Sequence, residues 1–270
     1  MSIKNQVRVF LFGIVLFSTS TISPKIIVTS IPKCGTHLLM KCIYEITGIG
    51  IIGHRKTYTI LCDQDVQAES LVGHAVCTEE NMRLIAKNGF KGVFILRDPR
   101  DQCISMIHYA KRYPNEWPKL AHMEFSQAIQ SWVLDTSLIA SVPMKWLDKK
   151  MKPFMGVVDF YDRYLGWIDH PLFYTTTFEK LVGPDGGGSK EAQIQEIMNI
   201  AHHLDHPISL DRAQKIAQSL FGKKGAYANT FRSGKIGSWR DYFTEQDKEV
   251  FKKAAGQLLI KLGYEKDLNW

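Results

Sequence analysis

Short apolar runs rich in β-branched residues alternate along the chain with longer stretches whose apolar residues recur at helical spacing. The short runs predict buried strands, and they lie at Ile26–Val28, Ser70–Val76, Gly92–Leu96 and Leu172–Phe178. The helical patterns begin at Thr36, after Thr78 and after Pro99, and they continue at Phe125–Ser141, Glu191–Leu204, Leu210–Phe221 and Glu245–Leu262. Strands that alternate with helices predict an α/β fold in which helices flank a central parallel sheet on both faces.

Several polar residues and glycines fit the ends of these helices. Gly48 is expected to stop the first helix, and Ser209 caps a later one. Thr244 and Asp247 have the spacing of a capping box, and Gly263 follows the last helix. The Gly183–Lys190 stretch, GPDGGGSK, is expected to be a flexible surface loop.

The turn between the first strand and the first helix carries Lys33, Gly35 and Thr36. A glycine turn at a helix N-terminus presents backbone N–H groups, and here a lysine and a hydroxyl accompany them. Such a place binds phosphate-like anions. The lysine precedes the glycine, so this is not the usual nucleotide loop, and a plain strand-to-helix turn with an exposed lysine is the alternative.

Cationic and titratable side chains follow three of the predicted strands. Lys33, His74 and Arg97 each lie just past a strand end. In parallel sheets, ligands gather beyond the carboxyl ends of the strands. We therefore expect these side chains to share one site.

Composition limits the possible chemistry only in part. The chain has 270 residues, 45% of them hydrophobic, which is enough for one sizeable core. Its formal charge of +7 suits an anionic ligand, but a solvated surface would carry the same charge. The five cysteines show no paired spacing and no zinc-ligand pattern, so reduced thiols and no metal are expected.

The N-terminus resembles part of a signal peptide. Lys4 and Arg8 precede the apolar run Val9–Phe17, which is short for a bilayer span, and the cleavage pattern after it is weak. Two interpretations stay open, namely a membrane-associating segment over residues 9–22 and a plain extension. We expect residues 1–24 to precede one cytoplasmic catalytic domain over residues 25–270.

Three stretches carry motif-like patterns, namely PKCGTHL (Pro32–Leu38), RDPRDQCIS (Arg97–Ser105) and FRSGKIGSWRDYFT (Phe231–Thr244). In the same order, they resemble motifs of the sulfotransferases that use 3′-phosphoadenosine 5′-phosphosulfate (PAPS), the relatives of the cytosolic sulfotransferases. PKCGTHL (Pro32–Leu38) resembles the PKSGTTW loop that holds the 5′-phosphosulfate. RDPRDQCIS (Arg97–Ser105) resembles R-x-P-x-D-x-x-x-S. FRSGKIGSWRDYFT (Phe231–Thr244) resembles F-x-R-K-G-x-x-G-D-W-K-x-x-F-T, with the third family position absent here. Weaker similarities are LGW (Leu165–Trp167) and TFEKL (Thr177–Leu181). The family's fold is a three-layer sandwich similar to that of P-loop nucleotide-binding proteins.

The resemblance implies a set of site residues. Around the 5′-phosphosulfate it implies Lys33, Cys34, Gly35, Thr36 and His37. Around the 3′-phosphate and the adenosine it implies Arg97, Ser105, Phe178, Arg232, Ser233 and Gly234. His74 resembles the histidine of the family's K-T-H element and would be the general base, with Lys33 assisting the leaving group.

The sequence departs from the family pattern at several of these places. Val72 replaces the lysine two residues before the catalytic histidine, and Leu38 replaces the tryptophan that stacks on adenine. Phe178 stands for a tyrosine, and Ser233 for a lysine or arginine. These departures bear on rate and cofactor affinity more than on the cofactor class.

The implied function is transfer of a sulfuryl group from PAPS to an acceptor hydroxyl or amine, without a metal and without nucleic acid. Two alternatives stay open, namely a nucleotide-dependent kinase or ATPase and a nucleotide-binding protein with impaired chemistry. The acceptor could be a small molecule, a lipid or a saccharide. Aromatic residues could line its pocket or fill the core, and they are Tyr109, Trp117, Trp132, Tyr161 and Tyr164.

Overall fold

The computed structural model describes residues 25–50, 69–134, 156–222 and 231–270. The predicted N-terminal segment over residues 9–22 lies outside these ranges, as do residues 135–141, the end of the helix predicted over Phe125–Ser141.

The described strands form one parallel sheet in the order β2-β1-β3-β4. They span Lys25–Ser30 (β1), Ser70–Gly73 (β2), Phe90–Leu96 (β3) and Phe173–Thr177 (β4). The register pairs Val28 with Val72 on one side and with Val93 on the other. The predicted central parallel sheet is therefore confirmed.

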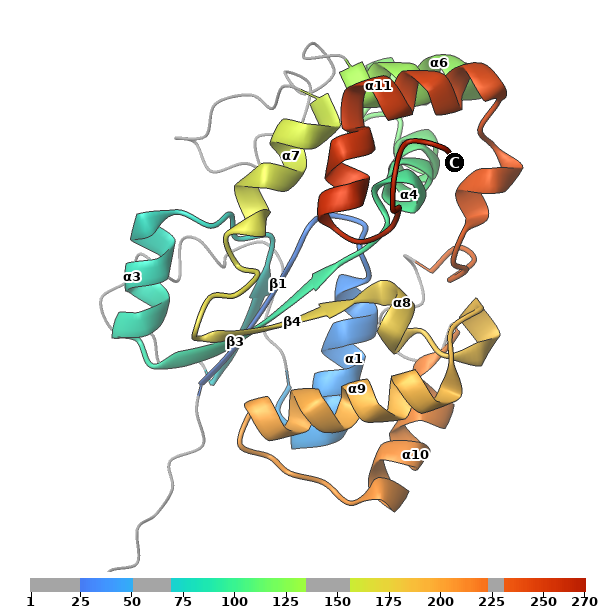
Figure 1. Ribbon diagram of the computed structural model, residues 1–270. Coiled ribbons are helices and arrows are strands. Elements are labelled where there is room, and N and C mark those ends of the chain that lie inside the picture. The colour runs from blue at the N-terminus through green and yellow to red at the C-terminus, as the bar shows by residue number, and fades with distance from the viewer. Residues whose placement is uncertain (1–24, 51–68, 135–155, 223–230) are drawn as a thin grey trace, which may run out of the picture.

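Helices cover both faces of this sheet (Figure 1). They are α1 (Thr36–Thr47), α3 (Glu79–Lys87), α4 (Pro99–Arg112), α5 (Pro118–Ala121), α6 (Phe125–Leu134), α7 (Gly156–Leu165), α8 (Phe178–Leu181), α9 (Lys190–His203), α10 (Leu210–Leu220) and α11 (Glu245–Lys261). Short 3-10 turns occur at η2 (Pro184–Gly186) and η4 (Ser238–Asp241).

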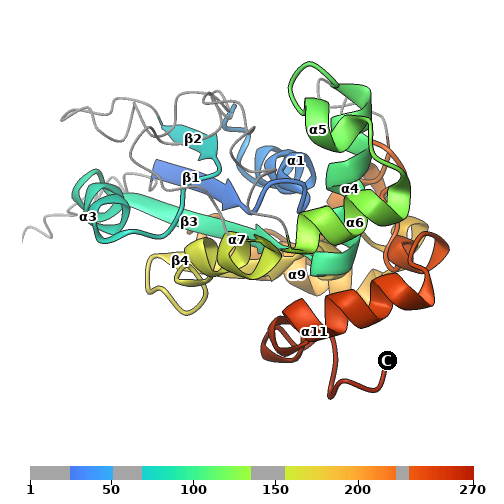
Figure 2. The same cartoon turned by 90° about the horizontal axis from the view of Figure 1, so that it is seen from above.

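Alternate residues of each strand face two separate apolar cores. Ile27 and Phe94 pack with residues of α3, α4, α6, α7 and α11. Val28, Val93 and Ile95 pack with α1, α9 and α10 on the opposite face. The result is three layers, and the arrowheads of β1 and β3 point toward the side where α4 and α6 lie (Figure 2).

The predicted helix ends agree closely with the structure. Thr78 and Ser209 accept backbone N–H bonds as N-caps of α3 and α10. Thr244 and Asp247 form the predicted capping box of α11. Gly48 ends α1 in the left-handed conformation, with its N–H bonded to the carbonyl of Tyr44.

Two expectations differ from the structure. β2 ends at Gly73 rather than Val76, because the backbone of Ala75 bonds to the Thr29 hydroxyl instead of to a strand. The Gly183–Lys190 stretch is not a loose surface loop, because Gly186 is buried in η2 and its carbonyl accepts the N–H of Ile236 at 2.9 Å.

Candidate active site

The turn from β1 into α1 is shaped by a glycine with left-handed backbone geometry. Gly35 has φ 103, and a Cβ built there would lie 2.9 Å from Cδ2 of Phe178. Gly35 is also the N-cap of α1, so no side chain caps this helix. The N–H groups of its first turn have no partner inside the helix, which leaves a helix N-terminus suited to an anion.

Not every group of the turn faces outward. The N–H of Cys34 donates to the carbonyl of Ile31 at 3.1 Å, and the thiol is buried against the hydroxyl of Tyr161. Burial raises the pKa of this thiol to about 12, so it stays neutral. His37 is partly buried on the first turn of α1.

Lys33 places a cation beside this turn. The backbone of Lys33 is in the left-handed region, with φ 71. The Nζ of Lys33 lies 4.0 Å from the centroid of the Tyr109 ring. Burial, and after it the charges of Arg112 and Arg97, together lower the lysine pKa to about 8. The ammonium thus sits among other cations, which is an arrangement that a bound anion would stabilise.

His74 is tied to the same turn through Ser30. Its Nδ1 lies 2.9 Å from the backbone carbonyl of Ser30 and 3.0 Å from the Ser30 hydroxyl. That hydroxyl lies 2.6 Å from the hydroxyl of Thr36. A carbonyl only accepts, so Nδ1 of the neutral ring carries the proton and Nε2 is the basic nitrogen.

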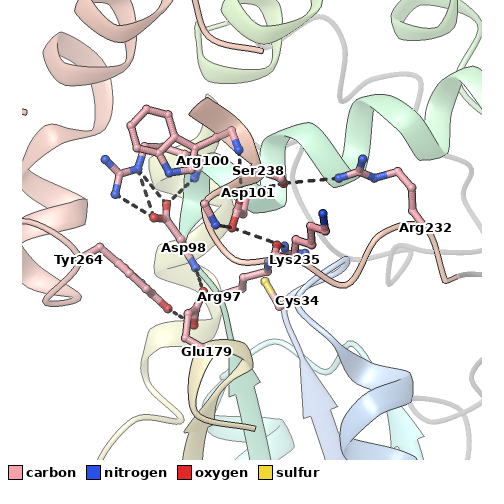
Figure 3. Close-up of polar contacts among 12 residues, drawn as sticks. Cys34, Arg97, Asp98, Arg100, Asp101, Glu179, Arg232, Lys235, Ser238 and Tyr264 are labelled. Carbon is pink, nitrogen blue, oxygen red and sulfur yellow. Dashed lines mark hydrogen bonds and ion pairs between the residues drawn. The ribbon is translucent and has the colours of Figure 1, made fainter. Parts of the chain in front are cut away.

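Arg97 lies buried at the end of β3 (Figure 3). Its guanidinium stacks 4.1 Å above the ring of Phe178. Its Nη2 donates to the carbonyl of Lys235 at 2.7 Å and lies 3.4 Å from a carboxylate oxygen of Asp101. Its Nε is buried and has no hydrogen-bond partner among the described residues.

Asp101 connects this arginine with the segment before α11. The carboxylate accepts the N–H of Gly237 at 2.7 Å, the hydroxyl of Ser238 at 3.0 Å and the N–H of Trp239 at 3.0 Å. Arg232 is exposed, and its Nη2 lies 3.4 Å from the same Ser238 hydroxyl. A continuous chain of contacts therefore joins Arg97 to Arg232 (Figure 3).

At Gly234 the backbone of this segment packs tightly against two aromatic rings. Gly234 has φ 64, and a Cβ there would lie 2.8 Å from the ring of Phe231 and 2.9 Å from that of Phe221. Ser233 beside it and Ser105 on α4 are partly buried. The structure thus brings both predicted arginines to one end of the sheet.

The comparisons with known proteins agree with this geometry. A family model described as "Sulfotransferase domain" matches residues 23–263. The chain belongs to the sulfotransferase family. A comparison with curated protein sequences gave no match.

Solved structures of other proteins share the fold. The mouse sulfotransferase SULT7A1 complexed with PAP (the desulfonated nucleotide) superimposes with a TM-score of 0.64 at 19% identity, covering 90% of this chain and 89% of that one. Retinol dehydratase in complex with androsterone and PAP gives a TM-score of 0.52 at 14% identity, covering 87% and 80%. The family match favours sulfuryl transfer over a kinase or ATPase.

Several site residues of this sulfotransferase were not foreseen from the sequence. Asp101 is a position of the R-x-P-x-D-x-x-x-S motif, four residues after Arg97, but it was assigned no role in the site from the sequence. Glu179 accepts the N–H of Asp98 and the hydroxyl of Tyr264, both at 3.0 Å, and burial raises the pKa of its carboxyl. The contacts of Glu179 join residues far apart in the sequence, so no local pattern predicts them.

Most of the candidate pocket aromatics belong to the core. The buried ones are Trp117, Trp132, Tyr161 and Tyr164. Tyr109 is only partly buried and faces Lys33. Val72 is buried against α1 and so supplies no cation to the sulfotransferase site.

The described residues contain neither a metal-binding cluster nor a membrane-spanning helix. No group of His, Cys, Asp or Glu in these ranges could hold a metal ion. None of the helices there has the length and apolarity needed to cross a membrane.

Proposed function

We propose that this sulfotransferase uses PAPS as donor, transfers its sulfuryl group to an acceptor hydroxyl, and uses His74 as general base. The observation that carries the proposal is the contact chain from Arg97 through Asp101 and Ser238 to Arg232, at the same sheet end as Lys33. The residues 25–270 would form one catalytic domain around this site.

On the 5′ side, the α1 N-terminus and Lys33 would hold the phosphosulfate. The first-turn N–H groups of Gly35, Thr36 and His37 are the donors there, while Cys34 shapes the turn through its bond to Ile31. The helix N-terminus and the ammonium together favour negative charge.

On the 3′ side, Arg97 and Arg232 would meet the ribose phosphate. The guanidinium of Arg97 offers its fork of donors, and its Nε is a buried donor with no partner among the described residues. Ser105 would add a hydroxyl. The backbone at Ser233 and Gly234 would approach closely because glycine has no Cβ.

Phe178 would contact the nucleotide by apolar surface alone, since it has no hydroxyl to bond the adenine. Its ring already carries the Arg97 guanidinium on one face at 4.1 Å. That stacking limits the movement of the arginine and orders it before the phosphate arrives.

The chemistry asked of the protein is charge stabilisation and one proton transfer. The acceptor oxygen attacks sulfur, the bond from sulfur to the 5′-phosphate oxygen breaks, and Nε2 of His74 takes the hydroxyl proton. Lys33 stabilises the charge that develops on the leaving phosphate. Ser30 holds the histidine ring by its Nδ1–H, so that Nε2 is the nitrogen that accepts.

Sulfate transfer from labelled PAPS to a panel of small-molecule, lipid and saccharide acceptors tests the activity. His74→Ala should lower kcat by about 10²–10⁴-fold with PAP affinity kept, as expected for loss of a general base. Arg97→Ala should raise the PAPS KM and weaken PAP binding by about tenfold or more. Unchanged PAP affinity in Arg97→Ala would refute the 3′-phosphate assignment.

A nucleotide-binding protein with impaired chemistry is the second candidate, because Val72 is buried in the core where the family pattern has a lysine. Tight PAP binding with no transfer to any acceptor of the panel would favour it. Transfer that depends on His74 would exclude it.

A further inference from the structure

We propose that Asp101 is a positioning residue of the 3′-phosphate site. It would hold the side chains of Arg97 and Arg232 in place without contacting the nucleotide. The inference rests on the proposed function. It concerns a carboxylate placed where a phosphate is expected, which is a costly arrangement unless the carboxylate has another task.

The surroundings of Asp101 show what that task is. The side chain is fully buried, and its oxygens are divided between two sets of donors. Oδ1 accepts from the Ser238 hydroxyl and the Trp239 N–H, while Oδ2 accepts from the Gly237 N–H and faces Arg97 at 3.4 Å. A single carboxylate thus fastens the start of η4 to α4.

Arg97 is held by the same arrangement from a second side. Its Nη2 donates to the carbonyl of Lys235, two residues before the segment that Asp101 holds. The guanidinium therefore lies between Asp101 and a carbonyl whose position depends on Asp101 (Figure 3). If the carboxylate were lost, both the arginine and the backbone near it would be released.

Arg232 depends on Asp101 through one hydroxyl. Ser238 donates its proton to Oδ1 of Asp101 at 3.0 Å, so its lone pairs are turned toward Nη2 of Arg232 at 3.4 Å. A hydroxyl has one proton, and the carboxylate decides where it points. Asp101 thereby orients an acceptor for the exposed arginine.

The charge of Asp101 is compensated by these partners. The donors on its two oxygens and the adjacent guanidinium leave little negative potential toward a ligand. The 3′-phosphate would then meet the outer faces of Arg97 and Arg232. The effect of Asp101 should accordingly be specific to nucleotides that carry a 3′-phosphate.

The test compares two nucleotides by calorimetry, PAP and 5′-AMP, which lacks the 3′-phosphate. In the unaltered protein PAP should bind much more tightly. Asp101→Asn keeps the shape but turns an NH₂ group toward the Gly237 N–H and Arg97. PAP affinity should fall about tenfold or more, while 5′-AMP affinity stays within about twofold. With PAPS, KM should rise and kcat at saturation should change little.

Asp247→Asn is the matched control. Asp247 is equally buried, caps α11 and accepts from Ser126 and Gln130, which lie on α6. Its loss should lower thermal stability with the ratio of PAP to 5′-AMP affinity preserved. In Arg97→Ala, adding Asp101→Asn should cause a further loss of only about threefold, as in Ser238→Ala, because only the contact with Arg232 then remains to be released.

Ser238→Ala decides the matter if Asp101→Asn does not fold, and it should weaken PAP by about threefold with 5′-AMP unaffected. Equal loss of both nucleotides in either variant, or wild-type PAP affinity in both, overturns the proposal for Asp101. If the unaltered protein does not prefer PAP over 5′-AMP, the proposed function itself fails, and the role of Asp101 with it.

Discussion

At the scale of single residues, two cations of the site each lie against an aromatic ring. Lys33 rests on the Tyr109 ring, and Arg97 rests on Phe178. An aromatic face stabilises a cation without neutralising it, so the charge stays effective toward an anion. Asp101 places a carboxylate beside Arg97, but the backbone N–H groups of Gly237 and Trp239 compensate its negative charge.

The pKa of Lys33 leads to a pH prediction. Burial first, and then the two arginines, lower it to about 8, so the free protein loses this charge as pH rises through that value. A bound nucleotide anion favours the ammonium and raises the pKa. At a pH just above about 8, PAP binding should therefore be accompanied by proton uptake. The affinity for PAP should decline as the pH rises further.

Calorimetry in two buffers of different ionisation enthalpy measures this proton uptake. Lys33→Arg keeps the positive charge at all these pH values, so uptake should vanish while binding persists. Equal proton uptake in Lys33→Arg and in the unaltered protein would assign the titration to another group.

At the scale of elements, local patterns predicted what local forces determine. The β1–α1 unit and the α11 capping box follow from neighbours within a few residues, and both were predicted. The end of β2 was not, since the backbone of Ala75 bonds to Thr29 and to Trp167, which lie 46 and 92 residues away. Asp101 was visible as a motif position, but its partners on η4 were not.

The contact between η2 and the segment around Gly234 is a second feature that the sequence pattern did not predict. A Cβ on Gly186 would lie 2.5 Å from the carbonyl oxygen of Gly234. Gly186→Ala should therefore displace the Gly234 backbone, lower the free energy of unfolding by about 1–3 kcal/mol and weaken PAP binding. Chemical denaturation and PAP titration measure the two effects.

Gly50→Ala is the control for this change, since no atom of the described residues lies within 4 Å of a Cβ at that position. This change should leave the free energy of unfolding and the affinity for PAP near their original values. A Gly186→Ala protein that binds PAP normally would show that the η2 contact does not shape the nucleotide site.

At the scale of the whole molecule, the C-terminus returns to the helix that carries the site (Figure 1). The guanidinium of Arg100 lies 4.2 Å from the Trp239 ring centroid and 4.5 Å from that of Trp270. It also pairs with Asp98 and with Glu265 at the end of the chain. Glu265 and Trp270 therefore stabilise the start of α4, next to Arg97 and Asp101.

Trp270→Ala tests how far this bracing reaches. Removing a partly buried indole that packs on Trp239 and Phe251 should lower the free energy of unfolding by about 2 kcal/mol. The midpoint of denaturant unfolding should fall without a change in its slope. Because the backbone N–H of Trp239 donates to Asp101, PAP affinity should fall as well, by a few-fold, and 5′-AMP affinity should not. A loss of stability with unchanged PAP affinity would mean that the tail supports the fold but not the phosphate site, and that η4 keeps its place through Asp101 alone.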